Sequence, residues 1–404
     1  MALTLPKVSI VMSNGALGSV VPSADGCMGV ILTGVAVTGP PAFTLGTSCY
    51  IDKFADLLTN YGITLANNPS IFKFFTEFYN HAPSGTRVWF MGLANTVTMT
   101  QMVTDVTTTY AHKLRKDANG EIRGLFICRT PATVSTVANG FDPDVITAYT
   151  AANAMAANGE TTPPIFCIIE GRDYTPAVGT VADLTALSLD RVGVMVGDTV
   201  ATGSGTVLNN AAMGILAGKL ASSPVQRNIG RVKDGPIAST TAYLKDKSIE
   251  QADYLSLHQK GYITFRVITG KSGFYFCDDP LATLPSGDYC HLTARRTIDK
   301  AYRLAYAALV EELLNEVSVN NKGQVSVSYA KSLENKVENI IINSMTVNGE
   351  LGNDPQNAND TGVQCLVDPT QNIISTSKLV ISLRIKPYGY ARTIEINLGF
   401  QILT

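Results

Sequence analysis

The sequence predicts a mixed fold that combines an α/β region with an α+β region, because its hydrophobic pattern changes along the chain. Strands alternate with helices from Leu125 to Leu220, which is typical of a parallel or mixed sheet covered by helices. After Tyr262, two strands precede two long helical segments, which indicates an α+β unit. Seven threonines between Thr96 and Thr109 mark the start of the middle region. We therefore expect a core domain built from the N- and C-terminal segments, with an inserted α/β outer region.

This interpretation divides the 404 residues into five ranges. They are an N-terminal arm at 1–26, a first core segment at 27–95, an inserted outer α/β domain at 96–245, a C-terminal core domain at 246–377, and C-terminal strands with a linking arm at 378–404. The length is sufficient for two to three domains.

The first core segment is predicted to hold three strands and two helices. Runs of aliphatic and aromatic residues predict strands at 29–32, 35–37 and 88–91. Apolar residues at helical spacing predict helices at 51–60 and 69–79.

The middle and C-terminal regions continue with longer helices. In the middle region we expect strands at 125–128, 165–169 and 192–196, and helices at 143–158, 181–187 and 208–220. In the C-terminal regions we expect strands at 263–268, 273–277, 378–385 and 393–402, and helices at 294–317 and 330–345.

The composition excludes some function classes and favours self-association. Charged residues make up only 16% of the chain and the net charge is −2, so the sequence has no electrostatic footprint for nucleic acid or anionic lipid. No apolar segment is long enough to span a bilayer, and the first residues do not resemble a signal peptide, so we expect a chain made in a cytoplasm. Low charge with a mean hydropathy of +0.13 suggests that part of the surface lies against other subunits.

The two ends of the chain alternate between apolar and other residues, as strands do. Five apolar residues at the C-terminus alternate strictly with their neighbours: Ile394, Ile396, Leu398, Phe400 and Ile402. Val8, Ile10 and Met12 form a similar pattern at the N-terminus. The C-terminal strand is either an edge strand of its own domain or an arm that adds to the sheet of a neighbour.

Sequence motifs for catalysis, cofactors or metals fail when each is tested. Gly270-Lys271-Ser272 lacks the first glycine of a phosphate-binding loop, so we expect a turn there. The four histidines show no metal-ligand spacing, and Asp278-Asp279 before a proline is more typical of a turn than of a carboxylate pair. The seven cysteines are scattered without CxxC, which predicts buried, reduced thiols. We expect no catalytic, cofactor-binding or metal-binding residues and no enzyme.

Three stretches of the chain resemble the contractile tail sheath family of phage tails, R-type tailocins and contractile injection systems. The first runs from Phe43 through the pair Tyr61-Gly62 to the strand that starts at Gly85-Thr86-Arg87, with one glycine where the family has two. The second runs from Gly261-Tyr262 through 273–279 to Arg295-Arg296, which opens a long helix; the family's Ala/Thr-Arg-Thr is missing there. The closing pair of strands is also similar.

The resemblance implies a structural subunit without a cofactor. Such subunits polymerise as stacked hexameric rings around an inner tube, with arms that link neighbours, and contract to drive the tube through a target envelope. Expected partners are copies of the chain, the inner tube protein, and baseplate and terminator proteins, in a particle built in a bacterial cytoplasm; neither nucleic acid nor membrane insertion is expected. The alternatives are a non-contractile shell or tube protein and an α/β nucleotide-binding enzyme.

The long helix that follows Arg295 carries its charges against the helix dipole. Basic residues gather in its first half and acidic residues follow later, whereas the dipole favours the reverse. The basic residues either pair locally or contact another subunit or the tube, and the second alternative singles out Arg295, Arg296 and Arg303.

Overall fold

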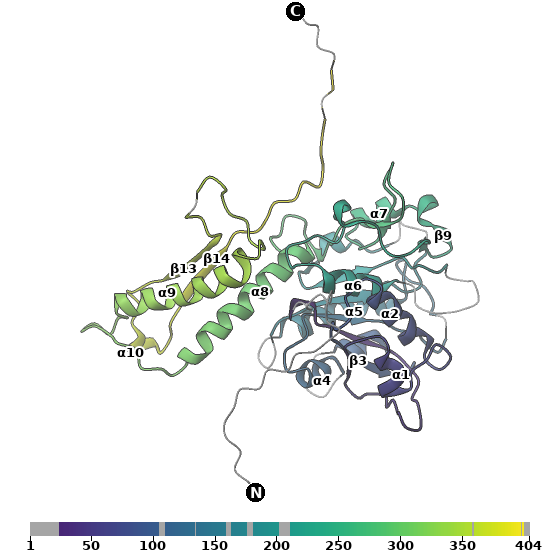
Figure 1. The fold of residues 1–404 in the computed structure, drawn as a ribbon, viewed down its shortest axis with the longest axis horizontal. Helices are drawn as coiled ribbons and strands as arrows, with labels where there is room; N and C mark the ends of the chain where they lie inside the picture. The colour runs from purple at the N-terminus through teal and green to yellow at the C-terminus, as the bar shows by residue number, and fades with distance from the viewer. Residues whose placement is uncertain are drawn as a thin grey trace, which may run out of the picture.

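The computed structural model describes residues 24–104, 110–133, 135–158, 163–175, 181–201, 211–357, 359–396 and 398–399. Figure 1 shows these residues as two bodies with an extended C-terminus. We call residues 24–291 the larger body and residues 292–390 the smaller body. Among the described residues, the helices are all too short or too polar to cross a membrane.

A six-stranded sheet lies in the centre of the larger body. Its spatial order is β2-β3-β1-β4-β5-β7, and every neighbouring pair is parallel except β2 with β3. The strands are β1 (Met28–Thr33), β2 (Cys49–Ile51), β3 (Val88–Leu93), β4 (Gly124–Ile127), β5 (Phe166–Glu170) and β7 (Val192–Met195). Every residue of β4, β5 and β7 is buried, so both faces of the sheet are covered. The predicted parallel or mixed sheet is confirmed.

Two groups of helices cover this sheet. One group pairs α2 (Pro69–Tyr79) with α6 (Met213–Ser222), and the other packs α3 (Met99–Val103) against α4 (Tyr110–Asp117) and α5 (Pro143–Ala157). The helix α2 has the predicted bounds because its apolar side chains repeat at helical spacing and Pro69 starts its first turn. Glycines in α6 allow close packing: a Cβ at Gly214 would lie 2.2 Å from the carbonyl oxygen of Phe74.

The sheet contradicts the expected division between 27–95 and 96–245. The strand β4 pairs in parallel with β1 along its full length, so both ranges contribute strands to one sheet. The physical reason is that β1 offers two edges, and β3 occupies only one of them. The described part of the threonine-rich stretch, 96–104, contains α3, which the side chain of Thr98 caps at its first turn.

Some predicted elements of the larger body have different bounds. The first helix, α1, covers only Asp56–Tyr61, because the residues just before it form β2 at the edge of the sheet. The helix predicted at 181–187 is a single 3-10 turn at Leu184–Ala186, and the strand predicted at 35–37 contributes one isolated bridge at Val37.

Short elements complete the larger body. They are the 3-10 turns at Ala24–Gly26, Val232–Asp234 and Ile249–Gln251, the helix α7 (Tyr254–Gln259), and the strands β6 (Ser188–Leu189), β8 (Tyr243–Leu244), β9 (Lys247–Ser248), β10 (Phe265–Arg266), β11 (Tyr275–Phe276) and β12 (Ala282–Thr283). The strands predicted at 263–268 and 273–277 are thus present as the short hairpin β10–β11.

The smaller body consists of two helices and a two-stranded antiparallel sheet. The helices are α8 (Leu292–Leu309) and α9 (Val327–Ile341), and the sheet pairs β13 (Val363–Val367) with β14 (Ile381–Ile385). A 3-10 turn at Val310–Glu312 follows α8, a π-helical turn at Ile342–Thr346 follows α9, and α10 (Ile373–Thr376) lies between the strands. The helix α8 therefore ends before the predicted residue 317, and β13 was not predicted.

The cysteines behave as predicted. All seven are free, and five of them are buried. Burial removes water from the Cys49 thiol and raises its pKa to about 11. This thiol is therefore protonated and unreactive at neutral pH.

Candidate assembly site at the root of the C-terminal arm

The C-terminal arm, residues 391–404, exposes its apolar side chains in the part that the structure describes. Ile394, Ile396 and Leu398 are 78%, 79% and 95% exposed. The described arm residues lie in no strand, and Figure 1 shows this segment leading away from both bodies. The strand β14, with which the arm could have paired, instead pairs with β13. Three large apolar side chains in alternating positions thus have no cover in the single chain.

Some of the predicted arm residues cannot be placed. Val8, Ile10 and Met12 lie outside the described residues, as do Phe400 and Ile402. Their part in an arm therefore remains a prediction.

The root of the arm is tied to the larger body by an ion pair. Arg392 donates from Nε to Oδ2 of Asp278 at 2.6 Å, and its guanidinium lies 5.4 Å from the ring centre of Tyr390. The hydroxyl of Tyr390 donates to the carbonyl oxygen of Gln226. Burial of Asp278 would raise its pKa, but Arg392 and His291 together hold the pKa of that carboxyl well below its usual range. Asp278 is therefore ionised at neutral pH and accepts the hydrogen bond from Arg392 as a carboxylate.

The neighbouring Asp279 is fully buried and caps the helix α8 from outside. Its Oδ2 accepts from the backbone N–H of Thr293 at 2.8 Å, and its backbone carbonyl accepts from the N–H of Leu292 at 2.9 Å. Because the first N–H groups of a helix have no partner within the helix, these two bonds fix the start of α8. Burial and the adjacent Asp278 carboxylate raise the pKa of Asp279 to about 6, although His291 acts against them.

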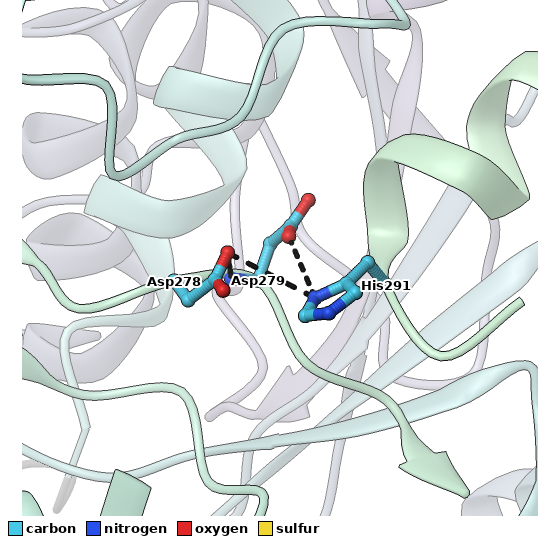
Figure 2. Close-up of side chains that lie close together, drawn as sticks. All are labelled: Asp278, Asp279 and His291. Carbon is cyan, nitrogen blue, oxygen red and sulfur yellow. Dashed lines mark hydrogen bonds and ion pairs between the residues drawn. The ribbon is translucent and has the colours of Figure 1, made fainter. Parts of the chain in front are cut away.

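Figure 2 shows that Asp278, Asp279 and His291 point toward one another, which raises the question of a metal site. Nδ1 of His291 lies 3.2 Å from Oδ1 of Asp279. The carboxylate oxygens are, however, already engaged by donors of the chain: the amide of Asn228 bridges the two side chains, and Thr293 and Arg392 take the other two oxygens. The guanidinium also supplies the positive charge that a cation would supply. The arrangement fits an anchor for α8 and for the arm, and it does not fit a metal centre.

The arginines singled out in the sequence are engaged within the chain. Arg295 is buried, pairs with Asp190 and Asp299 at 3.1 Å each, and lies over the ring of Tyr289. Arg296 is buried and donates to the carbonyls of Leu220 and Ser223 at 2.8 and 2.9 Å, at the C-terminal end of α6. Burial lowers the pKa of Arg296 to about 10. These two side chains join α8 to the larger body, because their positive charge satisfies carbonyls and carboxylates there. Their contact with another subunit or the tube remains a prediction.

The third arginine binds the root of the other arm. Arg303 donates to Asp25 at 2.8 Å, and Lys300 reaches the second oxygen of the same carboxylate at 2.7 Å. Asp25 is the second described residue of the chain, so the N-terminal end of the described chain is held by α8. The first described residues and the start of the C-terminal arm are thus both held near α8, the former through Asp25 and the latter through Asp278, next to the helix cap at Asp279.

The sheet β13–β14 has a hydrophobic face and two edges. Cys365 and Val367 of β13 and Ile381, Leu383 and Ile385 of β14 face the helices, while Gln364, Ser382 and Arg384 are exposed on the other face. The N–H of Lys386 donates to the carbonyl of Gly362, so these two residues form a hydrogen-bonded pair of the ladder. Hydrogen-bonded and non-hydrogen-bonded pairs alternate along an antiparallel ladder. The backbone groups of Ile381, Leu383 and Ile385 therefore point away from β13. Within the described chain, their N–H groups donate to no side chain, so β14 presents an edge to which a further strand can bind.

Two features of this site escaped the sequence analysis. Asp278-Asp279 was interpreted as turn chemistry, and its partners at positions 228, 293 and 392 are too distant in the sequence for any local rule to indicate. The strand β13 reads Val-Gln-Cys-Leu-Val, an alternation that breaks at Leu366, which is exposed. The only available signal was the glycine before it at 362, with a φ of 72°.

Two family models together match most of the chain. The model for the N-terminal domain of DUF2586 matches residues 5–280, and the model for its C-terminal domain matches residues 288–403. The division falls near 280–288, where the larger body ends, and not at the expected 245/246. A search of curated proteins found no match.

Several solved structures are similar in fold. The contracted helical sheath of the anti-feeding prophage is 16% identical, with a TM-score of 0.63 over 98% of this chain and 99% of that chain. The contracted PVC sheath complex of an extracellular contractile injection system is 12% identical, with a TM-score of 0.62 over 100% of this chain and 99% of that one. The sheath tail protein of Desulfitobacterium hafniense is 11% identical, with a TM-score of 0.50 over 94% of this chain and 100% of that one. The mixed helix and strand fold is therefore that of contractile sheath proteins.

Proposed function

The chain belongs to the DUF2586 family, and we propose that it is the structural subunit of a contractile sheath. In this proposal, copies of the chain form hexameric rings that stack around an inner tube. Contraction of the stack drives the tube through a target envelope. The subunit is made in a bacterial cytoplasm and becomes part of a phage-tail-like particle, with the tube, baseplate and terminator proteins as partners.

The observation that carries the proposal is the exposed, alternating C-terminal arm. Ile394, Ile396 and Leu398 are each more than three quarters exposed, and covering one large apolar side chain is worth about 1.5 to 3 kcal/mol. A soluble single chain gains nothing from this pattern, whereas a polymer of the same chain can bury it. The similarity in fold to sheath subunits, over 94 to 100% of this chain, is consistent with that use of the arm.

The open edge of β14 in a neighbouring copy is the proposed acceptor for the arm. A strand that binds there continues the alternation of the sheet, so Ile394, Ile396 and Leu398 lie on the same face as Ile381 and Leu383. Backbone hydrogen bonds supply strength, and the alternating side chains fix the register. The anchored arm roots then let each subunit move as a unit while the arm stays paired, which is what a sheath with two stable states requires.

The arrangement of the larger body supports a role without catalysis. In open parallel sheets, ligands bind at the carboxyl ends of strands where the strand order reverses, here between β1 and β4. That position is filled by the chain itself: the N–H of Thr130 donates to Thr33, and Arg129 pairs with Asp144 at 3.1 Å. Gly270, with a φ of 77°, lies in a turn that leads into a strand and not into a phosphate-binding helix.

Deletion of the arm tests the proposal. Removing every residue from Arg392 onward should leave a folded monomer that forms no sheath, because Arg392 binds Asp278 at the root while the apolar side chains of the described arm are exposed. Electron microscopy of the purified assembly and thermal melting of the monomer measure the two outcomes. Normal cylinders from the truncated chain would overturn the arm hypothesis, and an unfolded monomer would favour an edge strand that belongs to its own domain.

Contraction is tested separately from assembly. The rival reading, a shell or tube protein that does not contract, also predicts cylinders that need the arm. Particles exposed to acid or to mild denaturant should convert from long, narrow cylinders to short, wide ones. Cylinders of a single length and diameter under all these conditions would support the rival.

A further inference from the structure

The two edges of the β13–β14 sheet differ in a way that the proposed function does not explain by itself. A neighbour's strand could bind to β14 or to β13, since both are edge strands. Binding at the wrong edge would produce branched or irregular polymers. The structure shows a device that distinguishes the two edges.

Two glutamates of α9 occupy the outer edge of β13. Oε1 of Glu338 accepts from the backbone N–H of Cys365 at 2.7 Å, and Oε1 of Glu334 accepts from the N–H of Val367 at 2.8 Å. In the ladder, Cys365 and Val367 direct their backbone groups away from β14, so these are the N–H groups that an added strand would need.

The spacing of helix and strand makes this double contact possible. Glu334 and Glu338 are four residues apart on α9 and lie on one face, about 6 Å apart along the axis. Cys365 and Val367 are two residues apart on β13, a rise of about 6.6 Å. Consecutive outward N–H groups of the strand therefore meet consecutive carboxylates of the helix.

The carboxylate of Glu334 is held in place by a second contact. Glu334 is buried, and its second oxygen pairs with Lys331. Lys331 and the N–H of Val367 lower the pKa of Glu334, so it accepts hydrogen bonds at neutral pH. Hydrogen bonds from N–H groups to a carboxylate are stronger than those to a peptide carbonyl, which is all that an incoming strand can offer. The corresponding N–H groups of β14 meet no such side chain among the described residues.

We propose that Glu334 and Glu338 close the β13 edge to strand addition and so direct a neighbour's C-terminal arm to the β14 edge. The inference rests on the proposed function, because it concerns where the arm of a second copy binds. It makes the two glutamates positioning residues for assembly, acting through the backbone of β13.

Cysteine cross-linking in the assembled full-length chain tests which edge the arm occupies. Glu395 lies between Ile394 and Ile396, so on an added strand its side chain is on the face opposite to theirs. The exposed residues of the acceptor sheet share that face: Gln364 and Leu366 on β13, and Ser382 and Arg384 on β14. Glu395→Cys is combined with one cysteine at each of these four positions, and the assembly is then oxidised. Adjacent strands lie about 4.8 Å apart and strands two apart lie about 10 Å apart, whereas a disulfide needs Cα atoms within about 7 Å. Glu395→Cys alone reports any reaction with the native cysteines.

The expected result is dimer bands with a β14 cysteine and none with a β13 cysteine. In Glu334→Ala/Glu338→Ala, cross-links to β13 should appear, together with irregular polymers. Glu334→Gln/Glu338→Gln keeps an oxygen that accepts each N–H but loses the charge, so its cross-links to β13 should lie between those of the parent and those of the alanine variant. Glu311→Ala/Glu316→Ala removes two exposed glutamates and is the matched control.

Cross-links to β13 in the parent would overturn the inference, whether or not the alanine variant folds. The same holds if the alanine variant folds and its β13 cross-links stay at the level of the parent. In both cases the cross-links at β14 or β13 would still support the arm as the link between subunits. Cylinders that show no cross-link at either edge would overturn the proposed role of the arm, and the inference with it.

Discussion

The sheets of the two bodies differ in how completely they are covered. All four residues of β4 are buried, and its two neighbours supply hydrogen bonds along both edges. The strand β14 is half-buried on one face, exposed on the other, and bonded along one edge only. The first sheet is complete within one chain, whereas the second has room for another strand. The comparison indicates that the larger body supplies rigidity and the smaller body supplies the connection between copies.

The helix α8 joins the two regions through buried charges. Arg191 of the larger body binds Asp299 of α8 at 2.9 Å. Conversely, Arg295 and Arg296 of α8 bind an aspartate and a carbonyl oxygen of the larger body. Because breaking a buried ion pair is costly, we expect the two bodies of one subunit to move together. Movement between states is then left to the arms and to the contacts between subunits.

Four predictions test this comparison, in order of their expected effect on the stability of the single subunit. The largest concerns the closed sheet. Phe126 of β4 is fully buried and contacts the rings of Phe74 and Phe166, so Phe126→Ala should lower the free energy of unfolding by about 3 to 5 kcal/mol. Leu366→Ala on the open sheet is the control, and since Leu366 is exposed, it should change this free energy by less than about 0.5 kcal/mol. Urea denaturation measures both, and equal effects would contradict the comparison.

The second prediction concerns the connection through α8. Arg296→Gln should lower the free energy of unfolding by about 1.5 to 3 kcal/mol, because carbonyls at the end of α6 lose charged donors. Sheath formation should fall with it, as expected of a residue that serves the fold. Lys233→Gln at an exposed position is the control. A variant that melts like the parent but does not assemble would restore the original hypothesis of a contact with another subunit or the tube.

The third prediction concerns the pH dependence at the start of α8. The pKa of Asp279 is about 6 in the folded chain and 3.8 ordinarily, so folding favours its protonated form. Its contribution to stability is therefore present at low pH and decreases as the pH rises from about 4 to about 6. Asp279→Asn should remove this decrease, a difference of about 1 to 3 kcal/mol across the window. Denaturation of both proteins between pH 4 and pH 7 measures it, and parallel curves would refute the assignment.

The smallest effect on the subunit is expected in the arm, where the effect on assembly is largest. Ile396→Lys should leave the free energy of unfolding unchanged within about 0.5 kcal/mol, because this side chain is 79% exposed in the single chain. It should abolish sheath formation by placing a charge on the face that the acceptor buries. Glu395→Gln, one residue earlier on the opposite face, is expected to assemble normally. Regular cylinders from Ile396→Lys would show that this face of the arm is not buried in the polymer.

The sequence alone determined most elements with strong periodicity. The helix at 69–79 has its predicted bounds, that at 143–157 differs by one residue, and the strands at 88–93 and 124–127 contain or overlap their predicted ranges. These segments bury a continuous face, so the pattern of apolar residues is sufficient to define them. The alternation of the last residues was equally visible, and together with the family's ordered motifs it indicated a self-assembling subunit.

Only the tertiary structure decided which strands share a sheet and which groups the buried charged side chains bind. The parallel pairing of β1 with β4 joins residues almost a hundred positions apart, so no local signal could exclude a separate inserted domain. The sequence did not indicate the partners of Arg295 and Arg296, because Asp190 and the carbonyls at the end of α6 come from distant segments. Asp278 and Arg392 are 114 residues apart, and Glu334 meets Val367 only because α9 packs against β13. Hydrophobic periodicity is a local property that the sequence displays directly, whereas the partner of a buried charge or of an edge N–H depends on which segments fold against each other.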